Sequence, residues 1–161
     1  MIQSRFKLNA LLPLIPAGVV LWIMYELRGV LLPLDKLSFI VYLCLSLFLF
    51  ILVWVIFGEL RTKVIAVAIE GNSIKVGSFF GLGFSKKYYF NQLTGFKVSV
   101  LTTKTTSYEY LYLMVNNKKV IKISEFYHSN YSEMKDYITA KVHDLGYENF
   151  NLLREVKEIF K

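Results

Sequence analysis

LSFIVYLCLSLFLFILVWVIF, residues 37–57, is the stretch that decides the fold of this chain. Its twenty-one residues are apolar apart from Ser38 and Ser46, and no charged residue interrupts it. A helix of this length reaches about 31 Å, which matches the hydrocarbon thickness of a bilayer. A core helix of a soluble protein would carry a polar stripe, and this stretch has none. We therefore predict a transmembrane helix.

A second apolar run, Leu8–Tyr25, follows Arg5 and Lys7 near the N-terminus. A basic start and an apolar run are also typical of a cleaved signal peptide, but no small-x-small cleavage site follows. The link between the two runs is short, so the two helices are expected to pair. Residues 1–58 are predicted to form a transmembrane helical hairpin, with helices at about 8–28 and 37–57.

The distribution of charge predicts the orientation of this hairpin. Four basic residues flank the ends that would share one side, and two lie in the link between the helices: Arg5, Lys7, Arg61 and Lys63 against Arg28 and Lys36. Because basic flanks favour the cytoplasm, both termini are predicted to be cytoplasmic in a multi-pass protein of the cell (inner) membrane. Residues 59–161 carry fifteen Lys and Arg against ten Asp and Glu, and this net charge of +5 suits a domain that faces an anionic membrane surface.

The pattern changes from lipid-like to strand-like after the second apolar run. Six short runs rich in β-branched and aromatic residues follow, at 61–70, 73–80, 84–90, 95–101, 108–115 and 118–124. Turn residues such as Gly71-Asn72 and Asn116-Asn117 separate them. Short strands joined by short turns predict an antiparallel β-sandwich or barrel.

Two helical segments are predicted after the last strand. Asn130 with Glu133 resembles a capping box, and Gly146 supplies a stop. The apolar residues of this first segment fall on one helical face: Tyr131, Met134, Ile138, Val142 and Leu145. The remaining segment, 147–161, is predicted to form a short amphipathic C-terminal helix that is too short to be stable alone.

The order of these elements resembles the bacterial pleckstrin-homology-like (PH-like) domain membrane proteins. The segments that carry the likeness are VIAVAIEGNSIKVGSFFG at 64–81, FNQLTGFKVSV at 90–100, and KKVIKIS at 118–124 leading into SEMKDYITAKV at 132–142. The resemblance implies an α+β fold, in which a two-helix transmembrane hairpin precedes a PH-like cytoplasmic domain at 59–146. That domain would be an antiparallel β-sandwich or barrel capped by a C-terminal helix. A PH-like fold has seven strands, and the sequence shows six.

The sequence contains no recognisable catalytic motif. The phosphate-loop, HExxH and GxSxG patterns are all absent. The single cysteine, Cys44, lies in the membrane stretch, which excludes an internal disulfide and a cysteine metal cluster. His128 and His143 lack partners at metal-ligand spacing and are interpreted as surface or capping residues. We therefore predict a non-enzymatic protein with no catalytic, metal or cofactor-binding residues, no cofactor and no nucleic-acid partner.

Two groups of residues are candidates for binding. The lipid-facing candidates are Arg61, Lys63, Lys86 and Lys87, although solvated strand lysines and ordinary membrane flanks would look the same. The partner-binding candidates are Tyr88, Tyr110, Leu153, Val156 and Phe160, since exposed tyrosines and an apolar helix favour protein interfaces. A tyrosine-rich core is the alternative for the tyrosines.

The predicted hairpin would hold the domain at the membrane, so the domain does not need an affinity for lipid in order to be located there. The sequence therefore favours an adaptor or accessory subunit that binds a protein partner at the membrane. The alternative is a sensor of anionic lipid headgroups.

Overall fold

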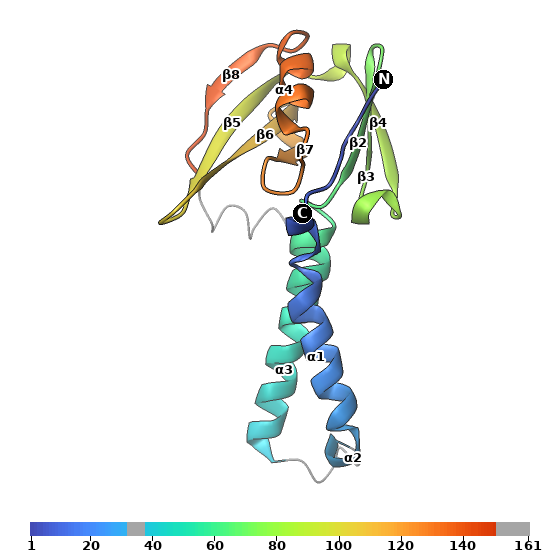
Figure 1. Ribbon diagram of the computed structural model, residues 1–161, viewed down its shortest axis with the longest axis vertical. Helices are drawn as coiled ribbons and strands as arrows, with labels where there is room; N and C mark the ends of the chain where they lie inside the picture. Colours follow the sequence, from blue (N-terminus) through green and yellow to red (C-terminus); the bar gives the residue numbers. More distant parts are fainter. Residues whose placement is uncertain (32–37, 151–161) are drawn as a thin grey trace.

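This computed structural model describes residues 1–31 and 38–150. It is an α+β structure in which two apolar helices form a stem and two four-stranded sheets form a domain at one end (Figure 1). The predicted α+β class is confirmed. The described strands form two separate sheets and no closed barrel.

The stem contains the two predicted apolar helices. The first consists of a 3-10 turn, η1 (Leu8–Leu11), and the helix α1 (Leu14–Glu26), which is followed by a short turn of helix, α2 (Arg28–Leu31). The second is α3 (Phe39–Val53), which continues into a π-helix, η3 (Trp54–Leu60). This second helix therefore runs past residue 57 and past the predicted domain boundary at residue 58.

Both helices are long and apolar enough to cross a membrane. Only 17% of the apolar window of the first helix and 6% of that of the second are buried inside the protein. Large apolar side chains such as Trp22 and Phe39 are instead exposed along the stem. A core helix of a soluble protein would bury such residues, so the exposure is compatible with a membrane environment.

The strands form two sheets of four. The first sheet has the order β1-β2-β3-β4 and contains β1 (Ile2–Gln3), β2 (Ala66–Glu70), β3 (Ser73–Gly77) and β4 (Ser85–Tyr89). The second sheet has the order β7-β6-β5-β8 and contains β5 (Gly95–Thr102), β6 (Ser107–Val115), β7 (Lys118–Ser124) and β8 (Asp144–Tyr147). All pairs are antiparallel except β5 with β8, which is parallel. The six predicted strands are confirmed, and β1 and β8 were missed.

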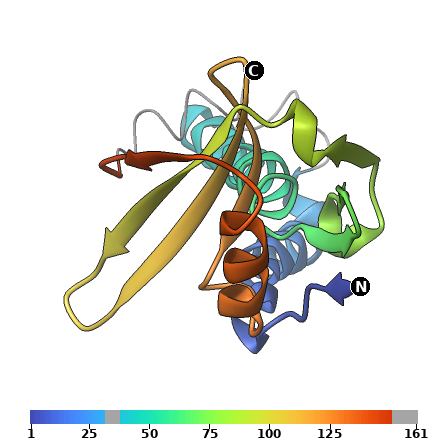
Figure 2. The same ribbon diagram turned by 90° about the horizontal axis from the view of Figure 1, so that it is seen from above.

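The core lies between the sheets, and the helix α4 (Tyr131–Thr139) covers it on one side (Figure 2). As predicted, Met134 and Ile138 point into this core and are fully buried. They pack with apolar residues of both sheets, including Ile69, Ile74, Leu111, Leu113 and Ile123. The helix therefore joins the two sheets into one folded unit.

The predicted end of this helix at Gly146 was wrong. The helix ends at Thr139, and Leu145 lies in β8 beside β5, where Phe96 N–H donates to the carbonyl of His143. Val142 is still buried against the core, so the apolar spacing continues from the helix into the connection and imitates a longer helix. Gly146 adopts a φ of +87° within the strand. β8 also crosses the predicted boundary between residues 146 and 147, so Tyr147 belongs to a strand and not to the helix predicted over 147–161. Residues 151–161 of that predicted helix lie outside the described residues.

The N-terminal residues form part of the domain. Ile2 and Gln3 pair with β2, and Ser4 N–H donates to the carbonyl of Val67 at 2.7 Å. Further along, Lys7 N–H donates to the carbonyl of Tyr127 at 2.8 Å. The chain before the first helix therefore lies at the same end of the stem as the sheets (Figure 1).

Candidate functional site

The second helix is fixed to the domain by a group of polar side chains at its C-terminal end. Glu59 forms an ion pair with Lys63, one helical turn further on, and accepts a hydrogen bond of 2.8 Å from the Tyr127 hydroxyl. Burial, followed by the nearby Glu59 carboxylate, raises the pKa of Tyr127, so its hydroxyl remains a neutral donor. The junction between helix and sheets is thus built around one carboxylate.

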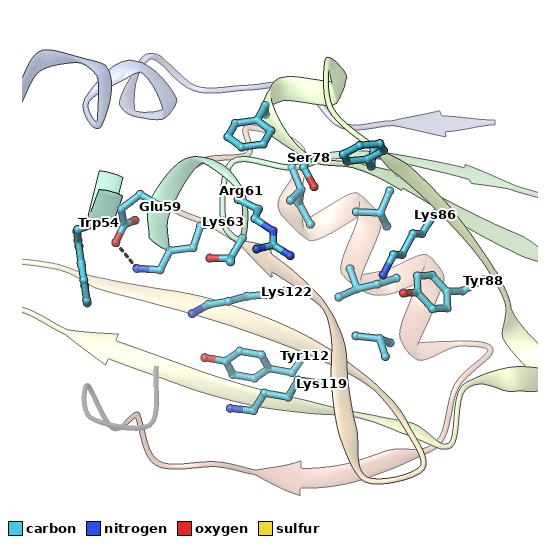
Figure 3. A pocket seen from close by; sticks show the side chains of 17 residues that line it. Trp54, Glu59, Arg61, Lys63, Ser78, Lys86, Tyr88, Tyr112, Lys119 and Lys122 are labelled. Carbon is cyan, nitrogen blue, oxygen red and sulfur yellow. Dashed lines mark hydrogen bonds and ion pairs between the residues drawn. The ribbon is translucent and has the colours of Figure 1, made fainter. Parts of the chain in front are cut away.

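A cavity of about 430 Å³ lies at this junction, between the end of the second helix and the end strands β4 and β7 (Figure 3). Seventeen residues line it: Trp54, Glu59, Arg61, Thr62, Lys63, Ile65, Val76, Ser78, Phe79, Phe84, Lys86, Tyr88, Tyr112, Lys119, Val120, Ile121 and Lys122. The cavity combines an apolar floor with polar groups, which is typical of a ligand site.

The charge of this lining is strongly positive. Five cationic side chains face one carboxylate, that of Glu59: Arg61, Lys63, Lys86, Lys119 and Lys122. They come from three separate elements, the end of the second helix, β4 and β7, and Figure 3 shows them around one space. Cationic side chains that share one hollow raise the positive electrostatic potential inside it, and this potential attracts anions.

Aromatic rings and a carboxylate hold the two lysines of β7. Lys119 Nζ lies 4.2 Å from the centre of the Tyr112 ring and 3.1 Å from Glu148. Lys122 Nζ lies 4.7 Å from the centre of the Tyr110 ring. The two ring contacts are cation–π interactions, which orient the ammonium groups, and Lys119 also forms an ion pair with Glu148.

Arg61 and Lys86 are the accessible cations of the cavity. Both side chains are exposed, and among the described residues neither has an ion-pair partner. Lys87 belongs to the opposite face of β4, because side chains alternate along a strand, and it lies over Tyr89 at 5.3 Å. The structure therefore brings Arg61, Lys63 and Lys86 together and separates Lys87 from them.

The predicted partner-binding residues lie in different places. Tyr88 is half-buried and lines the cavity. Tyr110 is only 4% exposed and stacks on Phe150, with 6.1 Å between ring centres, so it is not an outward-facing tyrosine. Leu153, Val156 and Phe160 lie outside the described residues.

The cavity residues that were not among the predicted candidates include Tyr112, Lys119 and Lys122. Tyr112 faces Lys122 across β6 and β7 because the register shifts by one residue between Leu113 and Met114. The two-residue Asn116-Asn117 turn alone would place Tyr112 opposite Ile121, so no signal in the sequence indicated this tyrosine–lysine pair. That these residues also face β4 depends on how the two sheets pack.

The interpretation of His128 as a surface or capping residue was wrong. The side chain is fully buried beside Phe6, and its two ring nitrogens lie 2.8 Å and 2.9 Å from the carbonyl oxygens of Ser124 and Ile65. The loop before α4 folds back beneath the N-terminal segment, which removes this histidine from solvent. His143, in contrast, is exposed.

No group of three or more His, Cys, Asp or Glu in residues 1–31 and 38–150 is arranged to hold a metal ion. No family model, curated protein or solved structure matches this chain. The PH-like resemblance therefore stays a prediction, and the cationic cavity carries the functional argument.

Proposed function

We propose that this chain is a membrane-anchored, non-enzymatic protein whose domain binds an anionic lipid headgroup in the cavity between β4 and β7. The observation that carries the proposal is the clustering of five cationic side chains around the end of a helix fit to cross a membrane. The sequence favoured a protein adaptor over a sensor of lipid headgroups. The positive charge of the cavity leads us to prefer headgroup binding.

The proposed membrane arrangement supports this site. The hairpin spans the bilayer, and the N-terminal strand and the sheets lie on one side, since β1 pairs with β2. The basic flanking residues favour the cytoplasm for that side. The first helix is retained in this proposal, because residues 2–7 before it form part of the domain.

A phosphate-bearing headgroup matches the cavity in charge and position. Arg61 follows directly after the second helix, and Lys86 lies across the cavity in β4. A guanidinium can bind two phosphate oxygens, and each lysine near an anionic surface contributes about 1 kcal/mol. The half-buried Tyr88 adds a neutral hydroxyl group to the same wall.

The test compares Lys86→Glu with Lys87→Glu in the full chain, purified in mild detergent. The two variants change the net charge equally, but only Lys86 lines the cavity. Titration with short-chain phosphatidylglycerol, with phosphatidylcholine as the neutral reference, should show saturable binding that Lys86→Glu weakens by about tenfold or more, corresponding to about 1.4 kcal/mol. Lys87→Glu should bind nearly as the wild type does, and binding should weaken as salt rises. Equal losses in the two variants would contradict a site in the cavity.

A second candidate function is the protein adaptor that the sequence favoured. The specific observation is that β4 pairs with β3 on one side only within the described residues, and four of its five residues are exposed. An open edge of this kind can accept an added strand from a partner. In the same preparations, a protein that co-purifies at high salt and survives Lys86→Glu would favour this function over headgroup binding.

A further inference from the structure

We propose that the loop between β3 and β4, residues 78–84, inserts its tip into the lipid interface beside the hairpin as a third membrane contact. Its side chains Leu82 and Phe84 are 91% and 93% exposed. These are the highest exposures among the large apolar residues that the structure describes, stem included. An apolar pair projecting so fully from a folded domain is a common mark of an interaction surface.

The base of the loop is anchored at the end of the second helix. Phe79 and Phe80 pack against a cluster that includes Val55 and Leu60 of that helix, and Phe80 N–H donates to the carbonyl of Val64 at 3.0 Å. Both phenylalanines adopt positive φ values, +52° and +59°, which non-glycine residues rarely do. Such a conformation persists only where packing imposes it, so the position of the loop relative to the helix is fixed.

Two glycines make the loop tight. A Cβ atom at Gly83 would lie 2.8 Å from a ring carbon of Phe79, and Gly81 adopts a φ of +94°. Gly83 N–H and Gly81 N–H both donate to the carbonyl of Ser78. The two phenylalanines at the base of this compact loop pack inward, whereas Leu82 and Phe84 are exposed, Phe84 being also one of the residues that line the cavity.

The position of the loop and the charges of the residues that flank it favour a lipid bilayer as the surface that the loop contacts. The loop lies at the end of the domain from which the stem leaves (Figure 1). No acidic residue occurs between Glu70 and Glu109, whereas Lys86 and Lys87 follow the loop directly. An apolar tip flanked by lysines matches the boundary between acyl chains and anionic headgroups. The proposal requires that the helices span the membrane, and it does not require a ligand in the cavity.

The experiment places a fluorescent NBD group on Leu82→Cys in the full chain, in a Cys44→Ser background, within nanodiscs of phosphatidylcholine and phosphatidylglycerol. The matched control is Asn72→Cys, an exposed residue in the β2–β3 turn at the other end of the same sheet. We expect a blue-shifted emission, quenching by nitroxide on the lipid acyl chains and slow reduction by dithionite at residue 82. Residue 72 should show none of these changes.

A second labelled variant, Phe84→Cys, should behave as Leu82→Cys does. Reduction by dithionite at equal rates at residues 82 and 72 would overturn the proposal. Protection of residue 82 without quenching by the lipid nitroxide would overturn it as well, because the tip would then be covered by protein.

Discussion

His128 connects three segments that are distant in the sequence. Its ring lies between the carbonyls of Ile65 and Ser124 and beside Phe6 of the N-terminal segment. Burial lowers the pKa of this ring, although the two carbonyl acceptors oppose the shift. Burial thus disfavours the protonated ring in the folded state.

The stability of the protein is therefore expected to depend on pH through His128. The unfolded chain binds a proton at this ring near pH 6.5, and the folded protein binds it only at lower pH. The free energy of unfolding should thus fall as the pH drops below about 6.5. Thermal unfolding in detergent between pH 7.5 and 5.5 measures this. His128→Gln should flatten the pH dependence, and the exposed control His143→Gln should retain it; an unchanged slope in His128→Gln would exclude this histidine as the cause.

The contrast between Lys86 and Lys87 shows what sequence can and cannot predict for a site. Strand periodicity already implies that adjacent residues of β4 face opposite ways. Which of the two faces a cavity depends on the second sheet, whose lysines belong to β7. The cationic residues were therefore recognisable by type, whereas their grouping required the packing of the two sheets.

At the scale of elements, β8 illustrates why a strand was mistaken for a helix end. DLGY has only four residues, all of them exposed, so its sequence shows no alternation of buried and exposed positions. Its pairing depends on Gly95 of β5, where a Cβ atom would lie 2.4 Å from Leu145 and 2.8 Å from the carbonyl oxygen of His143. The absence of a side chain at Gly95 thus leaves the space in which β8 pairs with β5.

Gly95→Ala should therefore loosen β8 and destabilise the domain. Forcing a methyl group into a closely packed site commonly costs about 1 to 3 kcal/mol, and the midpoint of thermal unfolding should fall accordingly. Adding Leu145→Ala should recover part of the loss, because it removes the side chain nearest to the new methyl group. Leu145→Ala alone serves as the control. A Gly95→Ala variant that melts as the wild type does would show that β8 is not held against β5 in this way.

At the scale of the whole molecule, the division into an apolar stem and a β-rich domain was predictable, because both signals are local. The uninterrupted apolar stretch predicts its helix, and the six strand runs and their turns predict the hairpins. The separation into two sheets was not predictable, since it requires that the consecutive strands β4 and β5 do not pair with each other. Ile2 and Gln3 form a strand only because β2 offers an edge to them.

The N-terminal strand allows a strict test of the predicted membrane topology of the two helices. Asn72 lies in an exposed turn, whereas the adjacent Ser73 is buried and would resist labelling on either side of a membrane. In a Cys44→Ser background, an impermeant maleimide should label Asp35→Cys in intact cells and should label Asn72→Cys only after permeabilisation. Gln3→Cys must follow Asn72→Cys, because β1 and β2 pair in one sheet. Labelling of Asn72→Cys in intact cells would show that the orientation is the opposite of the predicted one. Opposite behaviour of residues 3 and 72 would mean that β1 does not pair with β2 in the membrane-bound protein.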